Sequence, residues 1–399
     1  MLRIPGPGLK RGPFASSLDV RMAEQFLFLQ KTAGRGGAKN RLLDTLAALQ
    51  GGSDARLHVL CGETGEFTDR LAEMGVPCTV GTLPEWRKLG DRLRFGGAMR
   101  ANLRKLPFQR ADWVVSNEMW WAPHAGALAR SLGARSAVII RDGIATAPKA
   151  RRYHLHRNDL LLPSSIQIAE GLRVDADLAA RTQVFLDSVR LPPPVPAEVA
   201  NALAERLKAC PAVDRWLLVI GKLGPRKRQA DAVRVLRRLL DLGHAGFGLA
   251  LAGDCEPDYE AEMTAAIDAC GVADRVLRLG NVPNVRPLFD LAEICLLTSL
   301  REALPGSVIE ALEAGRPCFM YPCEGADDIF GPQRPDFVSE SFDPDALAAR
   351  IDAQMRQPEV LARHIGELQA RALGLFSPAA HLGELQRAFG IPVRSPEPA

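Results

Sequence analysis

Short apolar runs alternate with amphipathic segments along most of the chain. The apolar runs have the length of buried strands, and the segments between them place apolar residues three and four positions apart, as a helix does. Residues 38–50, for example, carry Leu42, Leu43, Leu46 and Leu49 on one side of such a helix. Strands that alternate with helices predict parallel sheets with helices on both faces.

The pattern predicts specific elements in both halves of the chain. Strands are expected at 24–30, 56–60, 76–80, 113–116, 137–140, 159–162 and 183–186, and then at 216–220, 247–252, 276–279, 294–298 and 318–321. Helices are expected at 38–50, 66–74, 123–132, 229–242 and 258–270, with one after Ser307, several from 343 onward and a last one from 376–378 to about 389.

A proline-rich stretch, LPPPVP at 191–196, interrupts the alternation and reads as a stiff, extended linker. The charge balance changes there. Residues 1–186 hold 27 Lys and Arg against 17 Asp and Glu, whereas residues 187–399 hold 23 against 30. We therefore predict one domain at 1–190, a second at 191–375, and a last helix and tail at 376–399. Residues 1–20 are rich in proline and glycine and are expected to form an irregular arm.

Composition narrows the class of protein. Apolar residues make up 47% of the chain and charged residues 24%, as in ordinary globular proteins. No apolar run approaches the roughly 18 residues of a membrane span, and residues 1–20 lack the apolar segment of a secretory signal. The eight cysteines are scattered without a C-x-x-C pair. These features favour a cytosolic, reduced protein, either free or peripheral at the inner face of a membrane.

The richest stretch for chemistry is SLREALPGSVIEALEAGRPC at 299–318. It predicts a strand end, a polar loop and a helix that Ser307 caps. Such a loop offers unpaired N–H groups and the positive end of a helix dipole to an anion. Two acids flank it, Glu302 in the loop and Glu310 in the helix. Ser307 and Glu310 also have the spacing of a capping box, which leaves a purely structural role open for Glu310.

This stretch resembles the signature of the retaining glycosyltransferases built from two Rossmann-like domains, the GT-B class, of the family-4 or "glycosyl transferases group 1" type. The resemblance rests on Ser299, Glu302, Pro305, Glu310 and Gly315-Arg316-Pro317. Gly221-Lys222 with Lys227, Val282-Pro283 and the Gly36-Gly37-Ala38 turn match further markers of that family. It implies two Rossmann-like domains that face each other across a cleft, with a C-terminal helix that returns to the first domain.

The resemblance also implies roles for individual residues. Glu302 would orient the transferred sugar, Glu310 would hold the ribose hydroxyls, and Lys222 and Lys227 would stabilise the departing diphosphate. The rest of the expected donor site is Gly36, Gly37, Gly221, Leu304, Pro305, Gly306 and Ser307. No metal is expected, because lysines and helix dipoles replace it, and the two Asp-x-Asp matches at 175–177 and 343–345 lie in helical contexts.

On the acceptor side the sequence departs from the family pattern. Asn117 stands where many relatives have a histidine, and Arg141-Asp142 replaces a frequent His-Asp pair; Glu118 completes the expected acceptor side. Lys222 replaces the usual arginine and loses its bidentate fork. Ala303 and Glu324 stand where the family has glycines. Acceptor identity and the contacts to the sugar are therefore open.

Residues 85–110 are strongly basic. They hold eight Lys and Arg against Glu85 and Asp91, with apolar residues at helical spacing. The favoured interpretation is a surface helix that packs on the sheet and has a solvated basic face. The alternative is an amphipathic segment that lies on anionic lipid headgroups. Nucleic acid is not expected, since no motif for RNA or DNA accompanies the charges.

Together these features predict a nucleotide-sugar-dependent, retaining, metal-independent glycosyltransferase that acts on a glycan or lipid-linked acceptor in cell-surface polysaccharide or glycolipid synthesis. Two alternatives stay open: a catalytically inactive binding or partner subunit with the same fold, and a sugar-nucleotide epimerase. An epimerase would form product without an acceptor.

Overall fold

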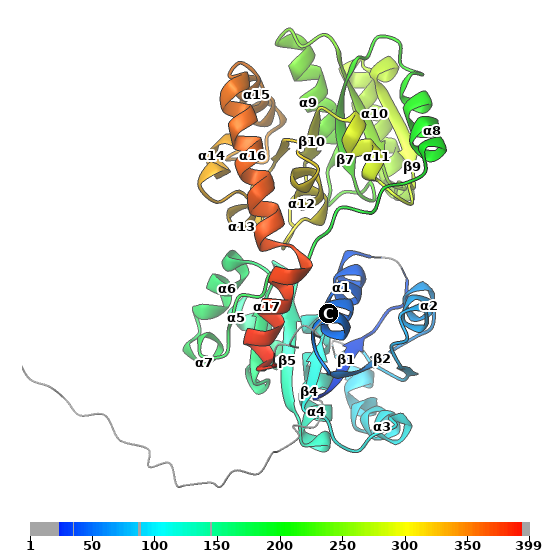
Figure 1. Ribbon diagram of the computed structural model, residues 1–399, viewed down its shortest axis with the longest axis vertical. Helices are drawn as coiled ribbons and strands as arrows, with labels where there is room; N and C mark the ends of the chain where they lie inside the picture. The colour runs from blue at the N-terminus through cyan, green and yellow to red at the C-terminus, as the bar shows by residue number, and fades with distance from the viewer. Residues whose placement is uncertain (1–23, 35, 87–88, 144–145, 393–399) are drawn as a thin grey trace, which may run out of the picture.

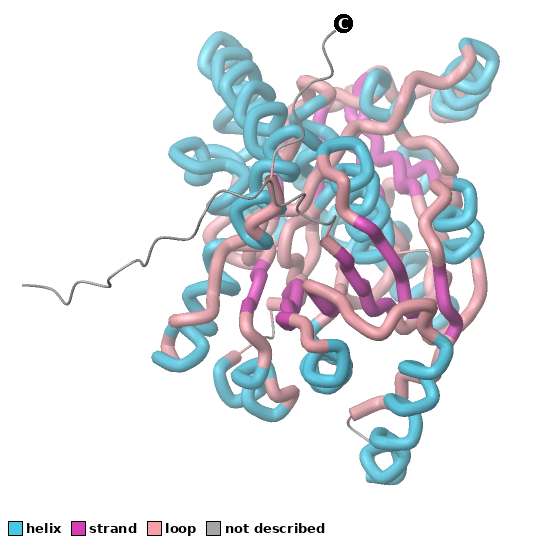
Figure 2. Tube along the Cα trace, turned by 60° about the horizontal axis from the view of Figure 1, so that its bottom comes forward, coloured by secondary structure: helices cyan, strands magenta, loops and turns pink. Residues whose placement is uncertain are grey.

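The computed structural model describes residues 24–34, 36–86, 89–143 and 146–392. Two parallel β-sheets are stacked end to end along the long axis of the molecule, each covered by helices (Figure 1). Turning the molecule shows the strands of both sheets enclosed between helices (Figure 2). The arm expected at 1–20, Arg87, Lys88 and residues 393–399 of the tail lie outside the described residues.

The first sheet has six strands in the order β3-β2-β1-β4-β5-β6. Its strands are β1 Gln25–Gln30, β2 Arg56–Cys61, β3 Cys78–Val80, β4 Trp113–Ser116, β5 Arg135–Ile140 and β6 Leu160–Pro163. Its helices are α1 Gly37–Gly52, α2 Glu66–Glu73, α3 Leu89–Lys105, α4 Ala122–Leu132, α5 Ala147–Arg152, α6 Ile166–Arg173 and α7 Ala176–Ala179, with short 3-10 turns η1 Met119–Trp121 and η2 Leu155–Arg157.

The second sheet has five strands in the order β11-β10-β7-β8-β9. Its strands are β7 Arg215–Ile220, β8 Phe247–Ala252, β9 Val276–Gly280, β10 Ile294–Leu297 and β11 Cys318–Met320. Around it lie α8 Ala197–Leu207, α9 Gln229–Asp241, η3 Pro257–Tyr259, α10 Glu260–Cys270, η4 Ala273–Arg275, α11 Arg286–Leu291, α12 Gly306–Glu313, α13 Ala326–Phe330, η5 Gly331–Gln333, α14 Arg334–Phe337, α15 Pro344–Met355 and α16 Pro358–Leu375.

Both sheets have the Rossmann order, so the predicted fold class is confirmed. Their strands are almost wholly apolar because helices bury both faces: every residue of β8, for example, is buried. In each sheet the order in which strands are added reverses beside the first strand. The reversal lies between β1 and β4 in the first sheet and between β7 and β10 in the second. Loops at the carboxyl ends of strands on either side of such a reversal form the usual ligand site of this fold.

The last helix, α17 Pro378–Phe389, leaves the second domain and packs on α1 of the first, as predicted. The buried His381 side chain lies 3.0 Å from the Thr45 hydroxyl. The ring of Phe389 meets the rings of Phe26 and Trp113 edge-on. The chain passes between the domains twice, near Val189 and near Phe376. The Val189 N–H donates to the Phe376 carbonyl at 2.9 Å, so the two connections are bound to each other.

Two expected strands differ from the structure. Residues 183–186 do not form a strand; they run beside β6 and donate to it only from the Gln183 and Phe185 N–H groups. Pro163, at the end of β6, has no N–H that could donate back to residues 183–186, so a regular ladder of hydrogen bonds cannot continue. The strand expected at 76–80 begins at Cys78. The boundary predicted at 190/191 lies between the two sheets and stays a prediction.

Candidate active site

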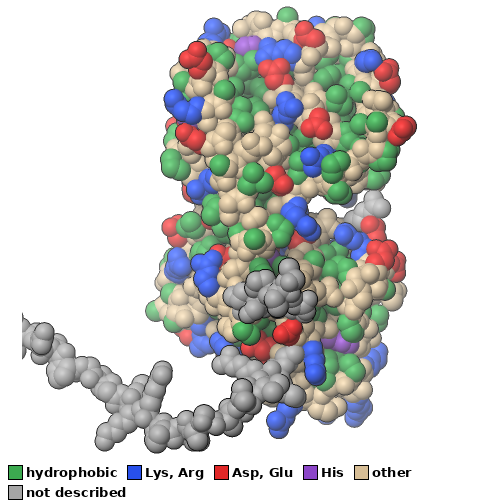
Figure 3. Space-filling view, in the orientation of Figure 1, with side chains coloured by type: hydrophobic (Ala, Val, Ile, Leu, Met, Phe, Trp, Pro, Cys, Tyr) green, Lys and Arg blue, Asp and Glu red, His purple; other side chains and the backbone are tan. Residues whose placement is uncertain are grey.

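Two loops at the reversal point of the second sheet form the centre of the candidate site. One joins β7 to α9, and the other joins β10 to α12. They are bound to each other: the Thr298 hydroxyl donates to the Lys227 carbonyl at 3.0 Å, and the Leu300 N–H donates to the Arg226 carbonyl at 2.9 Å. Cations from the first loop are therefore held against the acid of the second. In the space-filling view the molecule is hollowed on one side between the two domains (Figure 3).

Glu302 lies at the meeting point of these loops. One of its carboxylate oxygens lies 2.6 Å from Lys227 Nζ and 2.8 Å from Arg226 Nη1, and its side chain is 15% exposed. Burial raises the pKa of this carboxyl, but Lys227 and Arg226 outweigh burial, so the pKa lies below its ordinary value. The site therefore holds a fixed carboxylate between two cations at neutral pH.

Gly221 lies beside the ammonium group of Lys227. Its φ of 137° lies in the region that favours glycine. A Cβ on Gly221 would lie 3.7 Å from Lys227 Nζ, so the ammonium group lies directly over the glycine. The neighbouring Gly253 has a φ of 150°, and a Cβ there would overlap the Gly221 carbonyl. The glycines let the ends of β7 and β8 approach closely below the ammonium group.

Lys222 lies elsewhere in the same loop. Its ammonium group is 3.2 Å from Glu256, and its side chain is 66% exposed. The structure thus brings one of the two predicted lysines, Lys227, against Glu302. The second cation on Glu302 is Arg226, which sequence reasoning did not single out although it stands next to Lys227. A role for Lys222 toward a diphosphate stays a prediction.

The first turn of α12 follows directly after Glu302, Ala303 and Leu304. The helix begins at Gly306 with Pro305 as its N-cap, and no side chain caps it. The predicted cap at Ser307 and the capping box with Glu310 are therefore wrong, because the N-cap is Pro305, two residues before Ser307. The Val308 and Ile309 N–H groups donate to the Pro305 carbonyl. The preceding N–H groups, those of Gly306 and Ser307, are ones a helix cannot satisfy from within.

Without a capping role, Glu310 faces the first domain. Its carboxylate lies 3.8 Å from the guanidinium of Arg41 on α1. Arg41 also contacts Asp44 at 3.1 Å and the Ser188 carbonyl. Burial raises the pKa of Glu310 to about 7, although Arg41 lowers it in part. Arg41 carried no signal in the sequence, because only the packing of the domains brings it to this carboxylate.

Glu324 holds the loop that carries Glu302 through two hydrogen bonds. The Glu302 N–H donates to the Glu324 carboxylate and the Glu324 N–H donates to the Glu302 carbonyl, both at 3.1 Å. Burial raises the pKa of Glu324. A Cβ on Gly143 of the first domain would collide with the same carboxylate, so Glu324 also lies against the opposite domain. A Cβ on Gly325 would lie 2.7 Å from the Ala303 carbonyl, which explains a glycine there.

The loop expected at 324–328 is in part helix, because α13 begins at Ala326. Asp328 on this helix accepts the Ile166 N–H of the first domain at 3.0 Å. Burial raises the pKa of Asp328 to about 6. This contact closes the cleft between the domains on the side of α6.

On the first domain, the predicted acceptor residues form a buried network. Asn117 is fully buried and donates to Gln30 Oε1 at 2.7 Å and to the Ala38 carbonyl at 3.1 Å. Arg141 donates to the Asn117 carbonyl and forms two bonds with Asp187. Burial raises the pKa of Asp187, but Arg141 outweighs it and keeps the pKa below its usual range. The network joins the ends of β1, β4 and β5 behind the first turn of α1.

The remaining predicted residues lie around this network. Gly36 is the N-cap of α1 and Gly37 its first residue. Glu118 follows Asn117 and precedes η1, and Asp142 follows Arg141 at the end of β5. All four come from the carboxyl edge of the first sheet, which faces the second domain. Their roles toward an acceptor or donor stay predictions.

The residues that the structure describes contain no group of three or more His, Cys, Asp or Glu side chains placed to hold a metal ion. Asp175 and Asp343, the first acids of the two Asp-x-Asp matches, are N-caps of α7 and α15. In the same part of the chain, no helix is long and apolar enough to cross a membrane.

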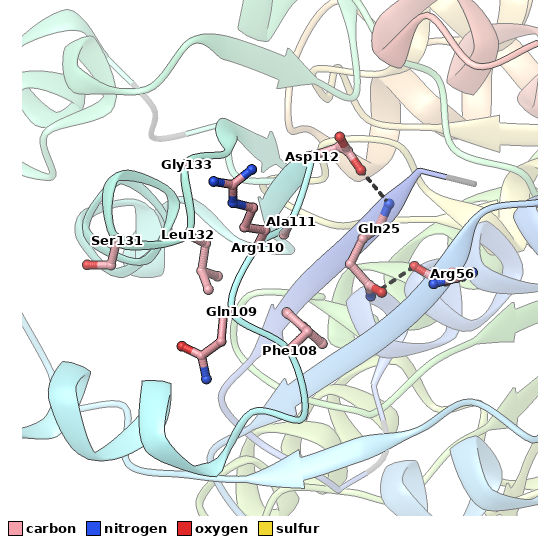
Figure 4. Close-up of a pocket in the computed structure, with 10 residues that line it drawn as sticks. All are labelled: Gln25, Arg56, Phe108, Gln109, Arg110, Ala111, Asp112, Ser131, Leu132 and Gly133. Carbon is pink, nitrogen blue, oxygen red and sulfur yellow. Dashed lines mark hydrogen bonds between the residues drawn. The ribbon is translucent and has the colours of Figure 1, made fainter. Parts of the chain in front are cut away.

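A hollow of about 750 Å³ lies at the opposite edge of the first sheet (Figure 4). It is lined at the amino ends of the strands, where the Gln25 N–H donates to Asp112 at 2.7 Å and the Gln25 side chain donates to the Arg56 carbonyl at 3.2 Å. This edge is turned away from Glu302, and the hollow is no part of the candidate site.

The second domain matches a known protein family. Residues 209–369, which hold the second sheet and most of its helices, match the family described as "Glycosyl transferases group 1". The matched segment contains Glu302, Lys227 and Glu310. The finding supports a group 1 glycosyltransferase.

Two curated relatives come from Streptomyces. The chain is 29% identical over 180 residues to the 2-deoxystreptamine glucosyltransferase of Streptomyces kanamyceticus, covering 44% of this chain and 45% of that protein. It is 27% identical over 242 residues to the 2-deoxystreptamine N-acetyl-D-glucosaminyltransferase of Streptomyces fradiae, covering 56% of each. The chain thus spans about half the length of these relatives.

Among solved structures, the Anabaena protein Alr3699/HepE in complex with UDP has a TM-score of 0.75 to this chain. It is 17% identical and aligned over 92% of this chain and 99% of the Anabaena protein. At this identity the similarity shows a shared GT-B fold.

Proposed function

We propose that this protein transfers a sugar from a nucleoside diphosphate sugar to a hydroxyl group of an acceptor, with retention of anomeric configuration and without a metal ion. The observation that carries the proposal is the group formed by Glu302, Lys227 and Arg226 beside the first turn of α12. It combines a fixed carboxylate, two cations and unpaired backbone N–H groups within one loop pair.

These groups suit the chemistry of such a transfer. The bond between the anomeric carbon and the β-phosphate oxygen breaks, and the acceptor hydroxyl oxygen forms a new bond on the same face while its proton passes to the departing diphosphate. Negative charge grows on the diphosphate, and Lys227, Arg226 and the helix terminus would stabilise it. Glu302 would contact the sugar that carries the developing positive charge, and the Glu310 carboxylate would accept hydrogen bonds from the ribose hydroxyl groups.

The relatives suggest which substrates to test first. The Anabaena structure holds UDP, so a uridine nucleotide is the first donor to test. The two Streptomyces proteins are named for transfer to 2-deoxystreptamine, so an aminocyclitol joins glycans and lipid-linked sugars as a candidate acceptor. Synthesis of a cell-surface polysaccharide or glycolipid is the process we favour for the glycan case.

The first test is a thermal-shift panel of UDP, ADP, GDP and their sugar conjugates, first in EDTA and then with magnesium. A ligand at 100 times its dissociation constant stabilises the fold by about 2.7 kcal/mol. We expect one nucleotide to raise the melting temperature in EDTA, and Lys227→Ala to lose that rise. If no nucleotide binds, the proposal fails and the non-catalytic partner subunit takes its place. Product formed from the donor without any acceptor would indicate an epimerase instead.

We also propose that the outer face of α3 can rest on anionic lipid at the inner face of a membrane. Four basic side chains of this helix, Arg94, Arg100, Arg104 and Lys105, are exposed, and so is Leu93, at 82%. Basic groups around an exposed apolar side chain are typical of helices that bind the lipid interface. Vesicle binding tests this idea separately from catalysis.

A further inference from the structure

A second, smaller pocket lies on the first domain at the same edge as Asn117. Its volume is about 270 Å³, and its lining consists of Glu85, Trp86, Trp120, Trp121 and Tyr153. Three of the five tryptophans of the chain therefore surround one small cavity. Nothing in the predicted site includes them.

The fold places this pocket beside the candidate active site. Trp120 and Trp121 form η1, directly after Asn117 and Glu118 at the end of β4. Trp86 and Trp120 pack against an apolar cluster of the first domain, and Ala303 of the second domain packs against the same cluster. Because Ala303 follows Glu302, the aromatic side chains and the catalytic loop share one packed region across the cleft.

The aromatic walls are rigidly held. The rings of Trp120 and Tyr153 meet edge-on at 4.9 Å, and Trp86 meets Phe95 in the same way at 5.2 Å. Trp86 and Trp120 are only half-buried, whereas Trp121 and Tyr153 are buried behind them. The pocket thus presents two indole rings on a fixed base, a surface that loses little conformational entropy when a ligand binds.

Polar groups stand around these rings. The guanidinium of Arg92 lies 5.1 Å from the ring centre of Trp86, and the ammonium group of Lys149 lies 5.3 Å from that of Trp120. Glu85 is the acidic residue of the pocket lining. Within the described residues, the buried indole N–H groups of Trp86 and Trp121 have no hydrogen-bond partner. Buried tryptophan N–H groups usually find one. These two are not accessible from the pocket, so the hydrogen-bond donors around the aromatic surface are Arg92 and Lys149.

We infer that this aromatic pocket binds one saturated, hydroxyl-bearing six-membered ring of the acceptor. The C–H groups on one face of such a ring carry partial positive charge and stack on the negative face of an indole, while its hydroxyl groups accept from Arg92 and Lys149 and donate to Glu85. The volume is close to the lower limit of about 300 Å³ for small-molecule pockets, which fits a single ring. The inference rests on the proposed function, because it assigns the pocket to the acceptor and not to the donor.

Tryptophan fluorescence can test the pocket directly. The full-length protein with saturating UDP is titrated with methyl β-D-glucopyranoside, a neutral sugar ring, and with 2-deoxystreptamine, an all-carbon ring with two amino groups. We expect a saturable change with at least one ring, and the preferred ring distinguishes a sugar acceptor from an aminocyclitol. Trp120→Ala should weaken that binding at least tenfold, and Trp120→Phe should restore most of it. Trp216→Phe, which removes a tryptophan of β7 in the other domain, should leave the affinity unchanged.

Two results would overturn the inference: no saturable change in the wild type with either ring, or a Trp120→Ala variant that binds the ring as the wild type does. The melting temperature of each variant with and without UDP is measured on the same samples. A variant that responds to UDP but not to the ring is folded and has lost only the pocket. A wild type that does not respond to any nucleotide contradicts the proposed function, whatever happens at the pocket.

Discussion

Replacing Glu302 with alanine separates the two tasks that the structure gives to this carboxylate. In the folded protein it neutralises Lys227 and Arg226, which lie 2.6 and 2.8 Å away. In the proposed reaction it contacts the sugar only as positive charge develops there. The two tasks predict different changes in stability, in nucleotide affinity and in turnover.

The loss of stability should be moderate. Breaking a fully buried ion pair costs about 3–5 kcal/mol, and an exposed pair is worth about 0–1 kcal/mol. Lys227 is 20% exposed and Arg226 is 50% exposed, so water can solvate part of the charge left without a partner. We therefore expect Glu302→Ala to lower the free energy of unfolding by about 2 kcal/mol. For a domain of roughly 200 residues this lowers the melting temperature by about 4–8 °C. UDP should recover part of the loss, because its diphosphate replaces the missing anion beside the two cations.

The loss of turnover should be larger. We expect Glu302→Ala to lower kcat by about 100-fold or more, which corresponds to about 2.7 kcal/mol in the barrier, while the Kd of UDP stays the same or falls. Turnover is measured as product formed from the donor that the thermal-shift panel identifies. Glu293→Ala is the matched control, since it removes a carboxylate paired with Arg215 at the far end of β7. If Glu302→Ala turns over within about threefold of the wild type, Glu302 does not act on the sugar and the reasoning fails.

Three further predictions concern other parts of the molecule. Glu310 has a pKa of about 7 in the folded protein, against an ordinary value near 4.5. Between these two pH values the folded chain binds more protons than the unfolded chain, so stability falls by about 3 kcal/mol as pH rises through this window and stays low above it. Glu310→Gln should remove that fall, measured by urea unfolding at pH 5 and pH 8. Phe389→Ala should cost about 3–5 kcal/mol in unfolding free energy, because it empties a buried site under α17. Neutralising Arg100, Arg104 and Lys105 together should weaken co-sedimentation with anionic vesicles at low salt.

Each of these has a control and a contrary outcome. Glu262→Gln, at an exposed carboxyl of α10, should keep the pH dependence of the wild type; an unchanged pH profile in Glu310→Gln would show that other groups cause it. Phe342→Ala, at a phenylalanine that is 40% exposed, should cost much less than Phe389→Ala. For the vesicles, neutralising Arg234, Arg237 and Arg238 on α9 should have no effect. A wild type that ignores anionic vesicles at low salt contradicts the membrane proposal.

The periodicity of the sequence was enough to predict both sheets. Buried strands such as β8 and amphipathic helices such as α1 follow from the spacing of apolar residues within a short segment, so they can be predicted without a structure. The failures have local causes too. Residues 183–186 are apolar, but Pro163 prevents a regular ladder, and Ser307 has the spacing of a cap although Pro305 begins the helix.

The candidate site could be predicted only where its residues share one loop. Glu302 and Lys227 were recognised from motifs that each lie within a single strand-loop-helix unit. Arg41 of α1 reaches Glu310 of α12 only because the two domains face each other there. The aromatic pocket draws Trp86, Trp120 and Tyr153 from three separate connections. Contacts of this kind depend on the packing of the tertiary structure, which no pattern in one sequence records.

The position of α17 has a consequence for the way this chain folds as it is synthesised. The helix follows the whole second domain in the chain, yet Leu385 and Phe389 belong to the core of the first domain. That core therefore stays open, with Phe26 and Trp113 uncovered, for the whole time in which the second domain is translated. The nascent first domain should need either a chaperone or its own α1 to shield this face. A chain that stops after α16 should carry a complete second domain and an unfinished first one.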